Sequence, residues 1–206
     1  MRDLISAFRA AAKDRMTAAG WRKRSGDIYT LPLDEGFHAW LGLNTATTYH
    51  PLKVNPVVGL HYEPLERLLA ELRGTKPALA TATLSTPVGY LTPDNRFLQL
   101  EIAADDQAGP AAERLHQLVS DYGLPFARRF AAVDALLSAF HTTDYVANPE
   151  RKRLLIPALH LLNGQSGEAR AELALGLATY QPYATPVADE YRHFASRLTA
   201  RLDTLG

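Results

Sequence analysis

The hydrophobic positions at the start of the chain change from a helical to a strand-like spacing. Apolar side chains recur every three or four residues through 4–19, which predicts an amphipathic helix that ends near Gly20. A short β-rich segment follows at 27–31, and the segments 37–44 and 54–62 then alternate apolar and polar residues. The pattern predicts a helix followed by a three-stranded antiparallel meander.

The segment after the meander mixes a short helical pattern with extended ones. Glu63-Pro64 opens a helix with leucines along one side, and Gly74 stands after its end. We expect 79–84 and 88–91 to be extended, with a break between them at Ser85-Thr86-Pro87, and the following turn residues to lead into a strand over 97–102.

Helical spacing takes over in the second half of the chain. Large apolar residues recur at this spacing between residues 115 and 140, which predicts two helices. Asn148-Pro149-Glu150 has the cap, first-turn proline and first-turn acid of a third helix. Ser166 and Thr185-Pro186 are expected to begin a fourth and a fifth.

Together these patterns predict an α+β fold of two regions. Residues 1–105 are expected to form an N-terminal helix with an antiparallel meander sheet, and residues 106–206 an all-helical half packed against it. The helix expected to begin at Pro149 is apolar nearly all round over Leu154–Leu162, so this part must be covered on more than one side. We therefore expect both regions to fold as one cooperative unit, with the sheet region as the template for the helices.

Composition is that of an ordinary globular protein. The chain has 206 residues, 47% of them hydrophobic, and 22 basic side chains balance 22 acidic ones. Balanced charge gives no global field that would attract nucleic acid or an anionic membrane. The absence of cysteine excludes disulfides, thiolate metal sites and cysteine nucleophiles.

Localisation and source are also expectations from the sequence. The chain has no apolar run of membrane-spanning length, and its first residues lack the apolar core of a secretory signal. We therefore expect a cytoplasmic protein without membrane contact. The abundance of arginine, alanine and leucine is typical of GC-rich bacterial genomes.

The sequence contains none of the motifs of catalysis or metal binding that we sought. It has no Walker-type phosphate loop, dinucleotide-binding glycine motif, nucleophile elbow or zinc-protease helix. None of the seven histidines stands three or four residues from another. We expect no metal and no other cofactor. The enzyme alternative is a small hydrolase or transferase with His38 or His61 as general base, since histidine titrates near neutral pH.

One face of the predicted meander combines aromatic, imidazole and amide side chains. Its members are His38, Trp40, Asn44, Asn55 and His61. In the strand register that pairs His38 with His61, Trp40 covers Gly59. Such side chains are typical of protein interfaces, so we expect this face to be partly exposed and to bind a partner. The alternative is that a C-terminal helix covers the face and that Trp40 is a core residue.

A basic segment after the first helix supports a third class of function. Arg22, Lys23 and Arg24 follow Trp21, so the cations could hold phosphates while the indole ring stacks on a base. The structural alternative is a solvated turn in which Trp21 covers the edge of the sheet. The balanced total charge argues against nucleic acid, although a local basic patch is compatible with it.

Several short sequence segments in the first half of the chain together carry a resemblance to known domains. They are Ala19-Gly20-Trp21-Arg22-Lys23 running into Ile28-Tyr29-Thr30-Leu31, then Trp40-Leu41-Gly42-Leu43-Asn44, Val54-Asn55-Pro56-Val57-Val58-Gly59-Leu60 and Gly89-Tyr90-Leu91-Thr92-Pro93. This half resembles bacterial α+β domains of unassigned activity, some of which accompany toxin systems as immunity-type proteins. The resemblance brings no catalytic residues with it. It implies a non-enzymatic protein-binding module, with an unidentified protein as its partner, which is our leading hypothesis.

Overall fold

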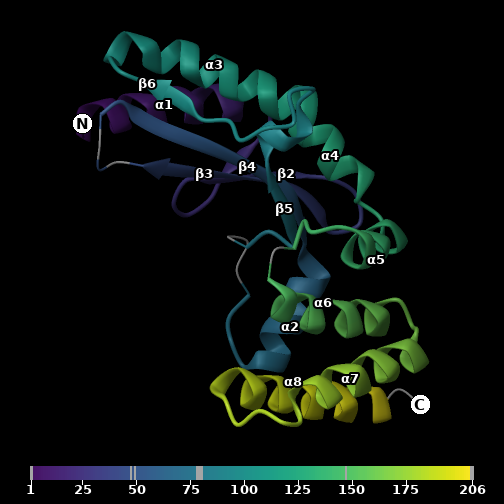
Figure 1. Ribbon diagram of the computed structural model, residues 1–206. Coiled ribbons are helices and arrows are strands. Elements are labelled where there is room, and N and C mark those ends of the chain that lie inside the picture. The colour runs from purple at the N-terminus through teal and green to yellow at the C-terminus, as the bar shows by residue number, and fades with distance from the viewer. Residues whose placement is uncertain (1, 47, 49, 78–80, 147, 205–206) are drawn as a thin grey trace. The chain divides into compact units, whose positions relative to one another are not determined.

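The computed structural model describes residues 2–46, 48, 50–77, 81–146 and 148–204. The fold is α+β, with an antiparallel sheet and a helical C-terminal half (Figure 1). The chain forms two compact units, which we call the sheet unit, Met1–His61 with Leu79–Ala131, and the helical unit, Tyr62–Ala78 with Ala132–Gly206.

These units differ from the two regions expected at 1–105 and 106–206. The helices between Ala108 and Arg129 belong to the sheet unit, because the first of them packs along the N-terminal helix. The helix that follows the meander belongs instead to the helical unit, where it packs against two later helices. The chain therefore passes from one unit to the other three times.

The sheet of the sheet unit follows the order of the chain. Its strands run in the order β1-β2-β3-β4-β5, and β6 pairs with β4 beside β5. They are β1 (Arg22–Lys23), β2 (Ile28–Pro32), β3 (Phe37–Ala46), β4 (Leu52–Tyr62), β5 (Leu84–Pro87) and β6 (Leu100–Ile102). Strands β2, β3 and β4 are the predicted meander.

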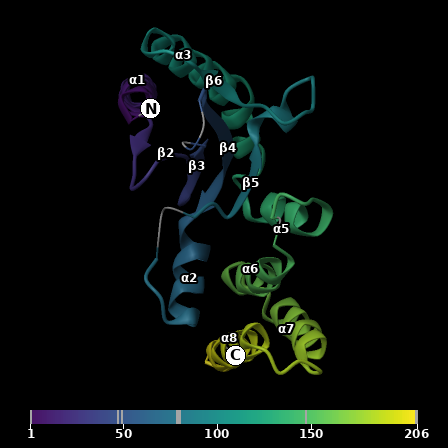
Figure 2. The ribbon, with the colours of Figure 1, turned by 60° about the vertical axis from the view of Figure 1, so that its left-hand side comes forward.

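Helices cover one face of this sheet. They are α1 (Arg2–Ala18), α3 (Ala108–Leu118) and α4 (Leu124–Arg129). The short turn η3 (Val119–Gly123) joins α3 to α4, η2 (Asp105–Gln107) precedes α3, and η1 (Val88–Leu91) follows β5. Helices α1 and α3 lie side by side over the sheet (Figures 1 and 2). Helix α1 buries Leu4, Phe8, Ala12 and Met16, one side chain per turn, as its sequence spacing predicts.

The fifth strand occupies different residues from those expected. Residues 88–91 form the 3-10 turn η1, so the prediction of an extended segment there is wrong. The strand lies at Leu84–Pro87, across the expected break, because β4 offers it a ladder from Leu60 to Val57. Pro87 is tolerated as the last residue of this strand. Residues 79 and 80 lie outside the described part of the chain, and the strand expected at 97–102 is shorter, beginning at Leu100.

The helical unit consists of an early helix and four late ones. They are α2 (Glu63–Arg73), α5 (Val133–Thr142), α6 (Pro149–Leu162), α7 (Ser166–Tyr180) and α8 (Pro186–Asp203). The predicted cap of α6 is confirmed: Asn148 Oδ1 accepts from the backbone N–H of Glu150 at 2.9 Å and of Arg151 at 3.3 Å. Thr185 caps α8 in the same way, whereas Ser166 begins α7 without forming a side-chain cap.

Helix α6 is the centre of the helical unit. It contacts α2, α5, α7 and α8, which confirms that a helix so apolar is covered on several sides. Its buried residues are Leu155, Ile156, Pro157, Ala158, Leu159 and Leu161. An ion pair between Arg151 and Glu66, with N and O 2.7 Å apart, joins α6 to α2, and the Glu66 side chain is only 10% exposed. Helix α2 thus supplies part of the covering that we expected from the sheet.

Tyr191 of α8 is packed tightly against α7. A Cβ atom added to Gly176 would lie 1.9 Å from the Tyr191 hydroxyl oxygen, so only glycine fits at that position. The hydroxyl is buried and has no hydrogen-bond partner within the described residues. Burial raises the pKa of Tyr191 from 10.0 to about 12. The ring therefore stabilises the unit by packing, whereas burial of its unpaired hydroxyl lowers the free energy of unfolding.

Removal of this hydroxyl is expected to stabilise the protein. Tyr191→Phe should raise the free energy of unfolding at pH 7 by about 1 kcal/mol, because no buried donor is left unpaired. The native pKa lies above the unfolded value, so the stability linked to this group is complete below pH 10 and is lost as the pH rises towards 12. Between pH 10 and pH 12, the free energy of unfolding of the variant should therefore fall by on the order of 2 kcal/mol less than that of the parent protein. Urea unfolding at pH 7, 10 and 11 measures both effects, and equal alkaline losses in the two proteins would contradict the second.

Candidate functional site

A row of paired residues crosses the sheet face opposite α1 and α3. Tyr29 pairs with Leu41, and both are buried on the helix-covered face. Their neighbours point the other way, because successive strand residues alternate between faces. Arg22 pairs with Thr30, and Thr30 pairs with Trp40, so these three form one row across β1, β2 and β3. We call this surface the tryptophan face; it comprises Arg22, Arg24, Ile28, Thr30, Trp40 and Asn44.

Trp40 is half-buried at the centre of this face. Its six-membered ring lies on Gly42 of the same strand, where an added Cβ would stand 2.3 Å from the ring. The atoms nearest to a Cβ added at Gly59, where the cover by Trp40 was predicted, belong to β5, with the Leu84 carbonyl oxygen at 2.3 Å. The indole Nε1 is buried without a hydrogen-bond partner among the described residues. Trp40 is thus neither a fully covered core residue nor a free surface side chain.

Two arginines lie on the same face as this ring, on the far side of β2 from β3. Arg24 Nε donates to Thr30 Oγ1 at 2.9 Å, and Thr30 is itself completely buried, so the Arg24 side chain is fixed along the face. Arg22 is exposed. Neither side chain forms an ion pair with a carboxylate in the described part of the chain. Lys23, between them, pairs across the sheet with Tyr29 and has its ammonium 5.2 Å from that ring centroid.

Two of the five predicted binding residues are interior. His61 is 1% exposed, and its Nδ1 lies 2.7 Å from the Thr81 carbonyl oxygen, a hydrogen bond in which the ring donates. Asn55 is 7% exposed, and its Nδ2 donates to the Leu98 carbonyl at 2.8 Å. Both side chains therefore satisfy backbone groups of the sheet unit, and a partner cannot reach them. Asn44 is exposed and His38 half-buried, so these two remain at the surface with Trp40.

The two histidines named for the enzyme alternative lie against each other. The His38 and His61 rings have centroids 5.9 Å apart, as expected from the register that pairs them. Burial of His61 leaves His38 as the ring that a substrate could reach. Within the ranges that the structure describes, no three histidine, aspartate or glutamate side chains converge as metal ligands. The pair therefore lacks an accessible second group with which to divide acid and base roles.

Trp21 is unsuited to the role that the nucleic-acid alternative gives it. The side chain is only 4% exposed, and its backbone N–H donates to the Met16 carbonyl at 3.0 Å. A base cannot stack on a ring that the protein already covers. The burial of Trp21 agrees with the structural alternative, although Arg22 and Lys23 form strand β1 and not a turn. Arg22 and Arg24 remain the accessible part of the basic segment.

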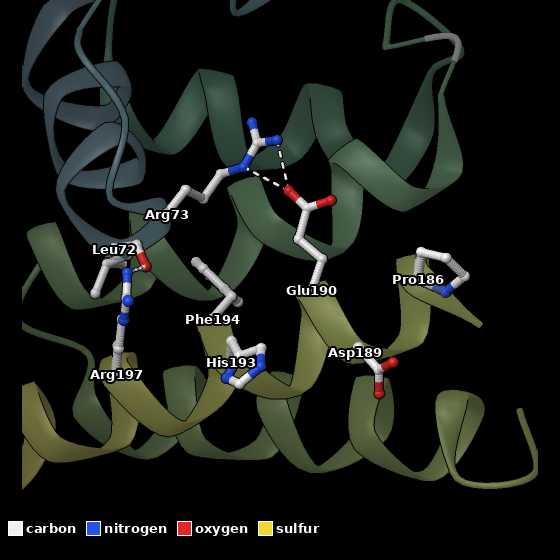
Figure 3. A pocket seen from close by; sticks show the side chains of 8 residues that line it. All are labelled: Leu72, Arg73, Pro186, Asp189, Glu190, His193, Phe194 and Arg197. Atoms are coloured by element: carbon white, nitrogen blue, oxygen red, sulfur yellow. Dashed lines mark hydrogen bonds and ion pairs between the residues drawn. The ribbon is translucent and has the colours of Figure 1, made fainter. Parts of the chain in front are cut away.

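The helical unit contains a pocket of about 540 Å³ between the end of α2 and the first turns of α8 (Figure 3). Arg73 donates from Nε and Nη2 to Glu190 Oε1 at 2.8 and 2.5 Å, and Arg197 Nη1 donates to the Leu72 carbonyl at 2.9 Å. These bonds join α2 to α8 across the pocket. The sequence did not indicate it, because charged residues at helical spacing are common on solvated surfaces.

The comparisons with other proteins leave the site to be interpreted from its own geometry. Among the described helices, none combines the length and the apolar character required to cross a membrane. No family model, no curated protein and no solved structure matches this chain.

Proposed function

We propose that this chain is a non-enzymatic binding protein that holds a protein partner on its tryptophan face. The observation that carries the proposal is a half-buried Trp40 on a sheet face opposite the helices of its own unit. Tryptophan is enriched among the few residues that supply most of the free energy of an interface. A ring already seated on Gly42 loses little conformational freedom when a partner binds.

The chemistry around Trp40 supports binding over catalysis. Besides the half-buried His38, the face carries the guanidinium groups of β1 and the Thr30 hydroxyl, and His61, which lies against His38, holds the Thr81 carbonyl. A sheet face fixed by cross-strand pairing also gives a rigid platform, which suits recognition of a preformed surface. The more specific form of the proposal, which the resemblance suggests, is a cytoplasmic bacterial protein that neutralises a toxin.

Photocrosslinking from the tryptophan face tests the proposal. The photoreactive residue p-benzoylphenylalanine replaces Asn44, which is exposed on this face, and the full chain is irradiated in cells of its source organism. We expect one protease-sensitive adduct of defined mass. Trp40→Ala in the same protein should reduce its yield by about tenfold or more, because loss of a central aromatic anchor costs roughly 2 kcal/mol of binding free energy.

Phe97→Ala is the matched control, since Phe97 is 53% exposed in the same unit and outside the tryptophan face. Its adduct yield should equal that of the parent protein. Thermal unfolding of each variant shows whether a lost adduct reflects a lost fold. An adduct that is unchanged in a folded Trp40→Ala variant would refute the proposal.

A further inference from the structure

We infer that the segment of the partner that contacts the tryptophan face is acidic, an inference that rests on the proposed function. Arg22 and Arg24 are two residues apart on one side of the chain, both next to Thr30 in the row that leads to Trp40. A guanidinium group has a planar set of donors that matches a carboxylate. Two of them on the same sheet face as Trp40, across β2 from it, form a surface complementary to acidic side chains.

The carboxylate nearest to these arginines along the sequence, that of Asp27, already has cationic partners. Asp27 lies in the loop between β1 and β2, and its Oδ2 accepts from Arg9 Nε at 3.0 Å and from Arg9 Nη2 at 2.5 Å. Lys23 Nζ stands 3.9 Å from the other oxygen of the same group. The Asp27 side chain is only 13% exposed. This carboxylate therefore compensates Arg9 and Lys23, and no carboxylate among the described residues forms an ion pair with Arg22 or Arg24.

The charge is confined to one end of the face. Lys53 and Glu101, which pair across β4 and β6, form an ion pair with N and O 3.2 Å apart. That part of the sheet is neutral, whereas the β1 part has two positive charges. Arg24 also has little freedom, because its Nε is bonded to the Thr30 hydroxyl while its Nη groups remain available. A carboxylate bound there would lie on the same face as the indole ring of Trp40, across β2 from it.

The same geometry favours an acidic protein segment over nucleic acid. One face of the Trp40 ring is used against Gly42, and two arginines are few compared with the several phosphate contacts of a nucleic-acid site. A protein segment with an apolar side chain on Trp40 and a carboxylate at Arg22 and Arg24 satisfies both features. The prediction is thus a short acidic segment that contains at least one large apolar residue.

Charge reversal in the crosslinking protein tests this inference. With p-benzoylphenylalanine at position 44, Arg22→Glu together with Arg24→Glu should reduce the adduct yield by about tenfold or more, since like charges then face each other. Arg114→Glu with Arg128→Glu is the matched control, because both arginines are exposed on α3 and α4, and it should leave the yield unchanged. Arg22→Glu alone, at an exposed position, covers the case in which the double variant unfolds. Mass spectrometry of the crosslinked peptide should show net negative charge.

The outcomes separate this inference from the proposed function. An adduct that depends on Trp40 but persists in folded Arg22→Glu and double variants, on a neutral or basic peptide, overturns the acidic segment alone. Absence of any Trp40-dependent adduct overturns the proposed function and this inference with it. An adduct that is destroyed by nuclease identifies a nucleic acid as the ligand and overturns both.

Discussion

A fragment of residues 106–206 is expected to be unable to fold cooperatively. It contains α3 and α4, whose buried side chains pack in the sheet unit, and it lacks α2, which packs against α6 and α8. Without α2, helix α6 loses part of the cover of its buried apolar residues. We expect the fragment to aggregate, or to unfold without a sigmoidal transition, when it is followed by circular dichroism during heating.

A second fragment provides the matched comparison. Residues 62–77 joined by a flexible glycine–serine linker to residues 132–206 keep the described elements of the helical unit together and omit α3 and α4. This chain should be a soluble monomer with a cooperative thermal transition. If the fragment 106–206 melted cooperatively and the linked fragment did not, the assignment of α2 to the helical unit would be wrong.

Replacement of Gly176 by alanine is expected to destabilise the helical unit by about 3 kcal/mol. The added Cβ would stand 1.9 Å from the Tyr191 oxygen and 2.3 Å from Cζ, and Tyr191 is itself only 3% exposed. The ring cannot move without displacing Tyr180 and Phe194, which contact it with centroids 4.9 and 5.9 Å away. Helices α7 and α8 must therefore separate or unfold locally.

Gly167 gives the control on the same helix. A Cβ added there meets no atom within 4 Å, so Gly167→Ala should leave stability unchanged or raise it by up to about 1 kcal/mol through helix propensity. Urea denaturation of the two variants measures the difference. Equal stabilities of the Gly176 and Gly167 variants would show that α7 and α8 accommodate the methyl group by a small shift.

Much of the fold could be predicted because its information is local. The spacing of Phe8, Ala12 and Met16 requires only one buried helix face, and Asn148 or Thr185 caps a helix through bonds to residues two or three positions away. The unit in which α2 packs, in contrast, is determined by residues that lie far from it in the sequence. Its apolar side chains show that one face is covered, but leucines do not specify whether a sheet or a helix covers them.

The sequence predicts which sheet face carries the site, but not how deeply each of its side chains is buried. Alternation along β3 and β4 correctly separated Trp40 and Asn44 from the helix-covered side. It could not show that Asn55 bonds a carbonyl 43 residues later in the chain, or that His61 is buried by the segment containing Thr81. Arg24 was noted only for its charge, because its bond to Thr30 exists only once β1 and β2 are paired.

The place of α2 in the chain also has a consequence for synthesis on the ribosome. Helix α2 leaves the ribosome early, whereas its partner α8 begins at Pro186, near the end of the chain. Synthesis proceeds at roughly 5–20 residues per second, so α8 is made on the order of ten seconds after α2. During this interval Leu65, Leu68, Leu69 and Leu72 are exposed on a nascent helix. This helix is therefore the segment of the nascent chain that we expect chaperones to protect while the later helices are made.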